Sequence, residues 1–192
     1  MTGEALAALI GRAKARDVEA LDALIDHFGP RIFGFLFRLT GSRHDAEEML
    51  QDVFVRLVRN IGRYEHDGQF EAWLFRIAGN LVRDRVRRLR RRPAMVSIDE
   101  SSGGDSHAVE IIAARPTTGG GDAEADRHEK MDKLQSALTQ LPDAEREVVL
   151  LRHFSQMSFA EIAAAMDTPL GTALARAHRG LNKLRALMDP NP

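Results

Sequence analysis

The chain has 192 residues, 44% hydrophobic and 29% charged, which is enough for one domain or two small ones, and no apolar run is long enough to cross a bilayer. The absence of cysteine excludes a disulfide framework, a thiolate zinc site and thiol redox sensing within this chain. The net charge of −1 conceals a segregation: residues 1–93 hold 17 basic and 13 acidic side chains, whereas residues 94–127 hold 2 and 7.

The first region is predicted to be helical, because its apolar residues recur at helical spacing and no period-two alternation is present. Residues 1–17 carry an acid early and no cleavage pattern, so we expect an amphipathic helix, not a signal peptide, and a soluble cytoplasmic protein without membrane insertion. Asp17 is predicted to cap a helix that runs to about His27. Gly29-Pro30 is predicted to start another helix, which ends near Thr40-Gly41.

A third helix is predicted to open at Ser42, which with Asp45 resembles a capping box. Its apolar positions are closely periodic. They are Met49, Leu50, Val53, Phe54, Leu57, Val58 and Ile61. The opposite face is free for solvent or a partner, and consists of Asp45, Glu48, Gln51, Asp52 and Arg56.

A fourth helix is predicted after the polar loop 63–68 and should end at Pro93. Its buried side is expected to hold Phe70, Trp73, Leu74, Ile77 and Leu81. The opposite side carries a stripe of Arg76, Asn80, Arg83, Arg87 and Arg90. Arginine supplies charge for phosphates and asparagine a donor and an acceptor for exposed bases, so the stripe suits a nucleic acid. A solvated helix face is the alternative, which the mutual repulsion of seven arginines within residues 83–92 disfavours.

Residues 94–127 contain SSGGDS, TTGGGD and scattered acids, and predict a flexible linker. From Asp126, helices are expected to resume: one to about Thr139, one from Pro142 to about His153, one with a capping box at 158–161, and one capped by Thr168 before Pro169. The predicted fold is therefore all-α, with small helical domains at 1–93 and 128–192 joined by an acidic linker.

The segment 158–184 has the layout of a helix-turn-helix, in which the second helix enters the DNA major groove. Thr172, Arg176 and Arg179 lie roughly on one face of that helix, within reach of bases and phosphates. An ordinary pair of packed helices is the alternative, which the small residues across the turn disfavour.

Catalytic interpretations find little support, because the seven histidines are dispersed and neither H-E-x-x-H nor a phosphate-binding glycine loop is present. The carboxylates beside His44 are better interpreted as the cap and solvated start of a helix. We therefore expect no catalytic residues, no metal site, no cofactor and no enzymatic activity.

Two stretches resemble the extracytoplasmic-function (ECF) sigma factors of the sigma-70 family. Residues 23–92 resemble region two, with DAEEMLQDVFVRL similar to its polymerase-binding helix and FEAWLFRIAGNLVRDRVRR similar to the helix that reads the minus-ten element. Residues 134–187 resemble region four, with LTQLPDAEREVVLLRHF, SFAEIAAAM and PLGT in the expected order. VSIDE, after the arginines, resembles the start of the family linker.

The resemblance implies a subunit that gives core RNA polymerase its promoter specificity, contacts the clamp helices and flap, binds double-stranded and single-stranded promoter DNA, and is sequestered by an anti-sigma factor. It assigns the clamp contact to Asp45, Glu48, Gln51, Asp52 and Arg56. It assigns the minus-ten element to Arg63, Tyr64, Arg76, Asn80, Arg83, Arg87 and Arg90. It assigns the minus-thirty-five element to Thr172, Leu174, Ala175, Arg176 and Arg179.

The recognition helix departs from the family pattern. After Gly-Thr the family typically has Val, a basic residue, Ser and Arg, whereas this chain has Ala173, Leu174, Ala175 and Arg176. Periodicity sends Leu174 inward and the family register sends it toward DNA; we follow the family register. Gly180 replaces a usual alanine, at a cost of about 1 kcal/mol in helix propensity.

Two other functions remain open at this point: a helix-turn-helix regulator that acts without polymerase and uses its first region for dimerisation or ligand binding, and a nucleic-acid-binding scaffold. The acidic face within residues 45–61 favours a protein partner over a ligand pocket. Two separate DNA-facing surfaces favour transcription initiation over simple repression.

Overall fold

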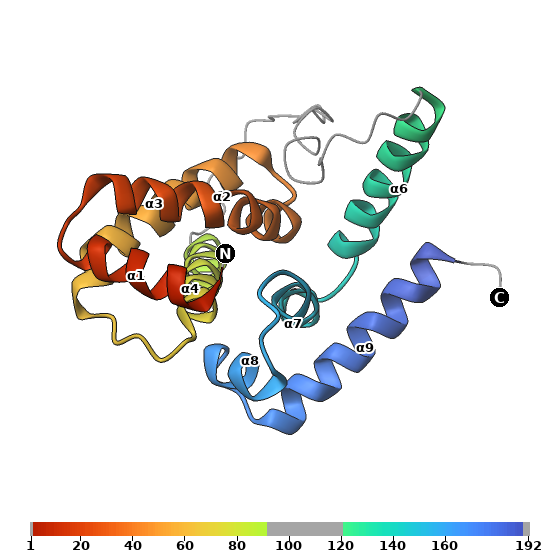
Figure 1. Cartoon of the computed structure of the whole chain (residues 1–192). Helices are drawn as coiled ribbons and strands as arrows, with labels where there is room; N and C mark the ends of the chain where they lie inside the picture. Colours follow the sequence, from red (N-terminus) through yellow and green to blue (C-terminus); the bar gives the residue numbers. More distant parts are fainter. Residues whose placement is uncertain (1, 92–120, 190–192) are drawn as a thin grey trace.

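The computed structural model describes residues 2–91 and 121–189, where all long elements are α-helices, as predicted. The N-terminal half consists of α1 (Gly3–Lys14), α2 (Val18–Thr40), α3 (Arg43–Asn60), the 3-10 helix η1 (Ile61–Arg63) and α4 (Phe70–Arg91). The C-terminal half consists of α6 (Gly121–Thr139), α7 (Asp143–Phe154), α8 (Phe159–Ala165) and α9 (Leu170–Met188). Figure 1 shows the two halves side by side, with α7 between the N-terminal helices and α9. None of the described helices is both long and apolar enough to cross a membrane.

The predicted linker lies largely outside the described residues. Of its range 94–127, the part up to residue 120 is not described, so its predicted flexibility stays a prediction. Its C-terminal end corrects our boundary, because α6 already begins at Gly121, ahead of the predicted Asp126. The sequence from Asp122 onward contains alanine and glutamate, which favour a helix despite the preceding glycines.

Three of the predicted helix starts are confirmed by their caps. The Asp17 carboxylate accepts the Ala20 N–H at 3.3 Å, and the Ser42 hydroxyl accepts the Asp45 N–H at 3.2 Å. Ser158 opens α8 with a complete capping box. Each cap satisfies an amide that would otherwise lack a partner in the first helical turn.

The predicted cap of α9 by Thr168 is wrong. The helix begins at Leu170 after Pro169 and has no side-chain cap. Thr168 instead uses its main-chain N–H, which donates to the Ala163 carbonyl at 3.0 Å and closes the turn after α8. The residue therefore lies too early in the chain to cap the first turn of α9.

The predicted break at Gly29-Pro30 is also wrong, because α2 continues through Pro30. Proline removes one hydrogen bond from a helix interior. Pro30 is exposed, but Phe28 and Ile32 on either side of it are buried, and a Cβ added to Gly29 would lie 3.7 Å from the Phe54 ring. Packing along the whole length of α2 thus outweighs the local signal for a break.

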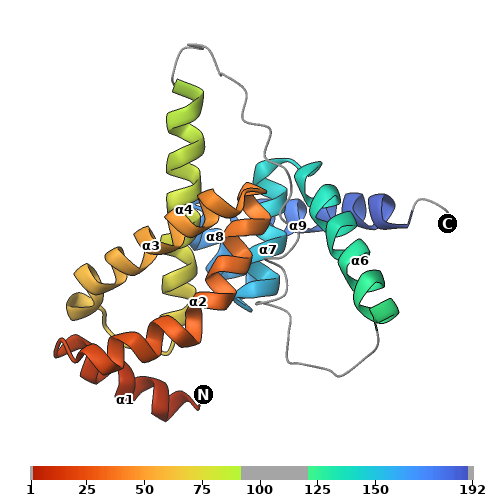
Figure 2. The same cartoon turned by 90° about the horizontal axis from the view of Figure 1, so that it is seen from above.

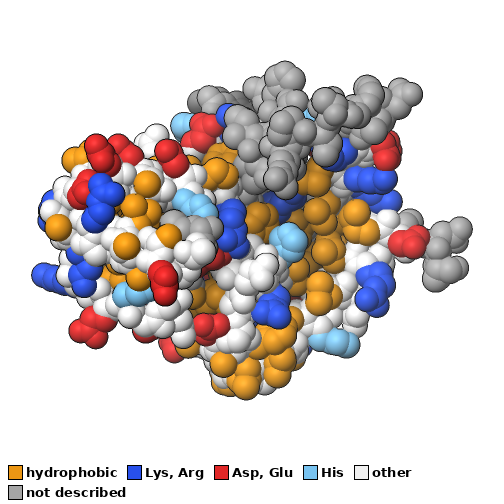
Figure 3. All heavy atoms as spheres, in the orientation of Figure 1, with side chains coloured by type: hydrophobic (Ala, Val, Ile, Leu, Met, Phe, Trp, Pro, Cys, Tyr) orange, Lys and Arg blue, Asp and Glu red, His pale blue; other side chains and the backbone are white. Residues whose placement is uncertain are grey.

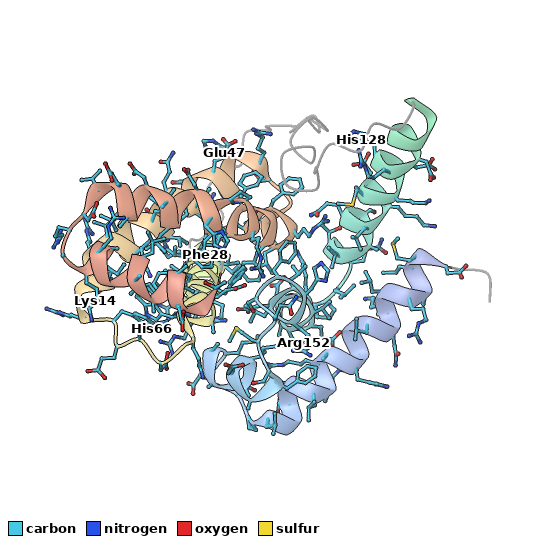
Figure 4. All side chains as sticks on the ribbon, in the orientation of Figure 1. Lys14, Phe28, Glu47, His66, His128 and Arg152 are labelled. Atoms are coloured by element: carbon cyan, nitrogen blue, oxygen red, sulfur yellow. The ribbon has the colours of Figure 1, made fainter. Side chains whose placement is uncertain are left out.

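The predicted apolar faces of α3 and α4 form the N-terminal core. Their fully buried members are Met49, Val53, Leu57, Ile61, Phe70, Leu74 and Leu81. The half-buried members are Leu50, Phe54, Val58, Trp73 and Ile77. Figure 4 places Phe28 among these helices, where its ring centroid lies 5.5 Å from that of Phe70.

The core is continuous between the two halves. Phe35 of α2 is fully buried, and its ring centroid lies 5.3 Å from that of Phe75 of α4 and 6.4 Å from that of Phe154 of α7. Polar contacts accompany this packing: Arg146 of α7 donates to the Leu39 carbonyl at 2.9 Å. The two predicted domains thus pack against each other in this structure.

A buried ion pair joins the halves near the middle of α4. Glu147 of α7 is 6% exposed, and its carboxylate accepts a hydrogen bond from Arg83. Burial raises the pKa of Glu147 to about 7, although the charges of Arg83 and Arg176 oppose that shift. Removing the carboxylate from water therefore offsets much of its attraction to the arginines.

The free energy of unfolding should depend on the protonation of the Glu147 carboxyl group. The pKa of Glu147 is about 7 in the folded chain, against an ordinary value of 4.5, so the folded state binds more protons between these values. Its contribution to stability therefore falls as the pH rises through that window. Relative to a Glu147→Gln variant, the wild-type free energy of unfolding should fall by roughly 2 kcal/mol between about pH 5 and about pH 8. Urea unfolding at a series of pH values measures this, and parallel pH profiles of the two proteins would contradict it.

Candidate functional site

The predicted polar stripe lies along α4, which extends beyond the other N-terminal helices in Figure 2. Arg76, Asn80 and Arg87 are exposed and Arg83 is half-buried. The side chain of Arg90 lies outside the described residues. The stripe is therefore on the side predicted from the periodicity, opposite the buried Leu74 and Leu81.

Part of the stripe faces the C-terminal half. Arg83 donates to the Glu147 carboxylate, to the Asn80 side-chain oxygen, and at 2.9 Å to the Ala165 carbonyl. Arg87 pairs with Asp84 of its own helix at 3.0 Å. Helical periodicity places these residues on a common face, but only the tertiary fold decides that Arg83 is engaged.

A cleft of about 670 Å³ separates α4 from α7 and α9. Five arginines line it: Arg83, Arg87, Arg91, Arg146 and Arg176. Because α4 and α9 each contribute, the predicted minus-ten and minus-thirty-five surfaces meet at this cleft. The local excess of positive charge gives it affinity for an anionic partner.

The loop between η1 and α4 contributes to a more polar pocket of about 400 Å³, which also reaches α8. Arg63 and Arg76 line this pocket and are exposed. Asp67 organises the loop, because its carboxylate accepts the Gln69 N–H at 3.0 Å, a bond that lowers its pKa.

Tyr64 does not present a free ring. It is 8% exposed, and its ring centroid lies 4.9 Å from that of Trp73 and 5.2 Å from that of Phe70. Its hydroxyl donates to Asp67 at 3.2 Å, and burial together with Asp67 raises the pKa of Tyr64 to about 12. The predicted DNA contact therefore needs revision: the ring anchors the loop, and its burial leaves no face on which a base could stack.

The predicted polymerase-binding face lies on the outer side of α3. Glu48, Gln51, Asp52 and Arg56 are exposed, and Asp45 is half-buried. We missed Arg85 of α4, which donates to Asp45 and, at 2.9 Å, to Glu48. The sequence already contained the information for this contact. Arg85 follows the buried Leu81 by one helical turn, so it lies on the side of α4 that faces α3 and not on the polar stripe.

The recognition helix α9 follows the family register. Leu174 is 44% exposed and Ala175 is also exposed, whereas Ala173 and Ala177 are buried. Leu181, one helical turn after Ala177, is 50% exposed. The outward positions early in α9 are therefore occupied by apolar methyl groups.

Two cations of α9 lie close to acidic residues of α7. Arg179 donates to the Glu145 carboxylate at 2.8 Å, and the half-buried Arg176 lies in the field of Glu147. Gly180 lets the two helices approach, because an added Cβ would lie 3.0 Å from Val149 and 3.3 Å from the Glu145 carbonyl. Its role in packing was not visible in the sequence, where it carried only a cost in helix propensity.

The turn before α8 is fixed by Arg152 of α7, labelled in Figure 4. Its guanidinium donates to the Met157 carbonyl at 2.8 Å and lies 5.7 Å from the Phe159 ring centroid. These contacts hold α8 against the end of α7, which supports the helix-turn-helix geometry of α8 and α9.

An apolar hollow lies between α6, α7 and α9, where hydrophobic side chains gather in Figure 3. Its volume is about 760 Å³. Its apolar lining includes Met131, Leu134, Leu138, Leu181 and Leu184. Exposed apolar surface of this kind is typical of protein interfaces.

Family models match both halves of the chain: "Sigma-70 region 2" matches residues 24–92 and "Sigma-70, region 4" matches residues 131–184. The chain is 30% identical over 176 residues to the ECF RNA polymerase sigma factor SigW of Bacillus subtilis, covering 92% of each protein. It is 36% identical over 170 residues to the RNA polymerase sigma factor CarQ of Myxococcus xanthus, covering 88% of this chain and 90% of CarQ.

Two solved structures have a similar fold. CnrH, in complex with the cytosolic domain of CnrY, gives a TM-score of 0.64 at 24% identity and covers 96% of this chain and 97% of that one. RpoE of Bartonella quintana, in complex with the anti-sigma factor NepR, gives 0.64 at 21% identity and covers 89% of this chain and 98% of that one. With both regions matched in order, the chain belongs to the ECF sigma factors of the sigma-70 family.

Proposed function

We propose that the chain is a cytoplasmic initiation subunit that recognises minus-ten and minus-thirty-five DNA elements for core RNA polymerase and catalyses no reaction itself. The observation that carries the proposal is the combination of two basic helices, α4 and α9, with a separate acidic face on α3. A DNA-binding regulator needs one reading surface and no acidic docking face, so this combination favours the polymerase subunit over a simple regulator.

The minus-ten element is assigned to α4. Arg76, Arg87 and Asn80 are exposed on one side of this helix, which supports contacts to phosphates and to unpaired bases. Arg63 extends this surface into the preceding loop, where the buried Tyr64 has a positioning role. Arg83 joins the surface when its present contacts to the C-terminal half are released.

The minus-thirty-five element is assigned to α9. Leu174 and Ala175 offer methyl groups to the major groove, where they can touch thymine methyls but cannot form the bidentate bonds that discriminate other bases. Thr172, Arg176 and Arg179 supply the polar contacts. Recognition should therefore depend more on shape and phosphates than on direct readout.

We assign the outer face of α3 to the clamp helices of core polymerase. The C-terminal half is assigned to the flap of the polymerase. The salt bridges from Arg85 to Asp45 and Glu48 support this assignment, because they hold the first turn of the face in one geometry. Residues 1–93 and the helices from Gly121 onward then act as two domains, and the segment between them as the linker.

An anti-sigma factor is the regulatory partner we propose. RpoE of Bartonella quintana was solved with such a factor, and the fold similarity extends over most of both chains. The apolar hollow between α6, α7 and α9 supports a protein ligand, because it offers hydrophobic surface beside Arg38 and Arg152.

Charge reversal on α3 tests the polymerase assignment. The double variant Glu48→Lys/Asp52→Lys should weaken binding to core polymerase by more than about tenfold, since two attractive contacts become repulsive. A pull-down with purified core polymerase measures this, and circular dichroism checks helicity. The matched control is Asp22→Lys/Asp26→Lys, which makes the same charge change on exposed positions of α2. Equal binding by the two double variants would remove the α3 assignment, and no binding by the wild type would favour the regulator.

Salt dependence tests the α4 assignment. In complex with core polymerase, Arg87→Ala should weaken binding to all promoter sequences and reduce the salt slope by about one counterion. Asn80→Ala should instead change the preference among minus-ten bases. Arg185, an exposed cation at the far end of α9, provides the control Arg185→Ala, which should leave the slope at the minus-ten element intact. An unchanged slope in Arg87→Ala would exclude the phosphate contact.

A base-by-base scan tests the recognition helix. With the wild-type holoenzyme, substitutions in the minus-thirty-five element should each cost less than about 2 kcal/mol, below what several bidentate contacts would give. Leu174→Arg should tighten binding by adding a cation next to the phosphates, and Arg176→Ala should weaken it. Several positions that each cost more than about 2 kcal/mol would show strong direct readout and contradict the assignment.

A further inference from the structure

We propose that Glu147 is an intramolecular latch: its carboxylate occupies Arg83 in place of a nucleic-acid phosphate and holds the C-terminal half against α4, so that Arg83 reaches DNA only after the halves separate. The inference rests on the proposed function of α4 as a DNA-contacting helix. In the proposed closed state, the Glu147 carboxylate and a DNA phosphate compete for the Arg83 guanidinium.

Both terminal nitrogens of the Arg83 guanidinium donate hydrogen bonds in this closed state. It bonds to the Glu147 carboxylate and to the Ala165 carbonyl, which belong to α7 and to the end of α8. It also holds the side-chain oxygen of Asn80, so the amide that should read a base is tied to the same group. Two members of the predicted stripe are thus occupied by contacts that DNA would have to replace.

Glu147 has the chemistry of a phosphate substitute. A carboxylate offers a guanidinium two anionic oxygens in a plane, which is the geometry that arginine also uses for phosphates. The nearby Arg176, a predicted minus-thirty-five contact, lies in the field of the same carboxylate. One acidic side chain therefore attracts a cation from each of the two DNA-binding helices.

Gly79 makes the contact possible. It is buried on α4 one residue before Asn80, and a Cβ at this position would lie 2.8 Å from the Glu147 Oε1 atom. A distance below 3 Å cannot be maintained, so any larger residue would move the carboxylate from its place. The glycine lies in the middle of a helix, where it lowers helix stability by about 1 kcal/mol relative to alanine, and the close approach of Glu147 accounts for its presence.

The rest of the interface holds the halves in register without involving the stripe. Arg31 of α2 donates to the Phe154 carbonyl, and Arg146 of α7 donates to the Leu39 carbonyl. Phe154 of α7 also packs against Phe35 of α2, so the latch acts together with apolar packing between the halves.

The latch is weak enough to release. Burial of the Glu147 carboxylate costs desolvation energy that its attraction to Arg83 only partly offsets. A DNA phosphate remains hydrated on its outer oxygens, so it can replace the carboxylate without the same cost. Opening then returns Glu147 to water and frees Arg83 from the C-terminal half.

Two variants open the latch by different means. Gly79→Ala displaces Glu147 sterically, keeps every charged group and raises the helix propensity of α4, so it should not unfold that helix. Glu147→Lys places a cation against Arg83. Its charge-matched control is Glu129→Lys, because Glu129 is exposed on α6 away from the contact. The double variant Arg83→Glu/Glu147→Lys restores an opposite-charge pair and separates opening from misfolding.

Two measurements on the full chain report the result. The chain has no cysteine, so Val18→Cys and Lys183→Cys, both at exposed positions, accept a fluorophore pair whose energy transfer reports the separation of the halves. Binding of a short fluorescein-labelled single-stranded oligothymidine reports access to α4. Since the apparent affinity scales with the open fraction, opening should tighten this binding by about three- to tenfold.

Gly79→Ala and Glu147→Lys should both show lower energy transfer and tighter oligothymidine binding than the wild type. Glu147→Lys should also bind more tightly than its control Glu129→Lys. The double variant Arg83→Glu/Glu147→Lys should recover the energy transfer of the wild type. Unchanged energy transfer in Gly79→Ala and Glu147→Lys would overturn the latch, and so would opening without a gain in oligothymidine binding. A failure of the proposed function would give a different result from a failure of the latch. In that case neither the wild type nor any variant would support promoter-dependent transcription by core polymerase, regardless of the energy transfer measured.

Discussion

The burial of α2 on several sides is the constraint on which the rest of the structure depends. Its apolar residues face α1, α3 and α4 on one side and α7 on the other. Phe35 illustrates this, because its ring contacts Phe75 of the N-terminal half and Phe154 of the C-terminal half. A helix with a single apolar stripe would support one bundle only; α2 also provides the surface on which the second half packs.

The packing leaves charged groups at the boundaries between helices, and their pairing separates the functional surfaces. Arg85 turns toward Asp45 and Glu48 of α3, whereas Arg83 and Arg87 turn toward the cleft with α7 and α9. Residues two positions apart on α4 thus serve different faces, since successive residues are rotated by about 100° around a helix. The arginine run is a set of distinct sites and not a uniform basic patch.

The same geometry brings the two proposed DNA surfaces close to one acidic residue. Arg83 bonds to the Glu147 carboxylate, and Arg176 lies in the electrostatic field of the same group. Arg179 is likewise held by Glu145. Acidic groups of α7 therefore lie next to basic residues of both α4 and α9 in this structure.

The sequence by itself determined the helical class, most helix boundaries and the buried faces of α3 and α4, because these follow from local periodicity and capping. It also indicated both family regions and the outward side of α4. It misplaced a break at Pro30 and a cap at Thr168, since long-range packing and the turn geometry outweighed local signals there. Tertiary structure decided that Tyr64 is buried, that Gly79 and Gly180 admit close neighbours, and that Arg83 binds Glu147. These features join residues distant in the chain, and no local pattern encodes which distant side chain fills a given space.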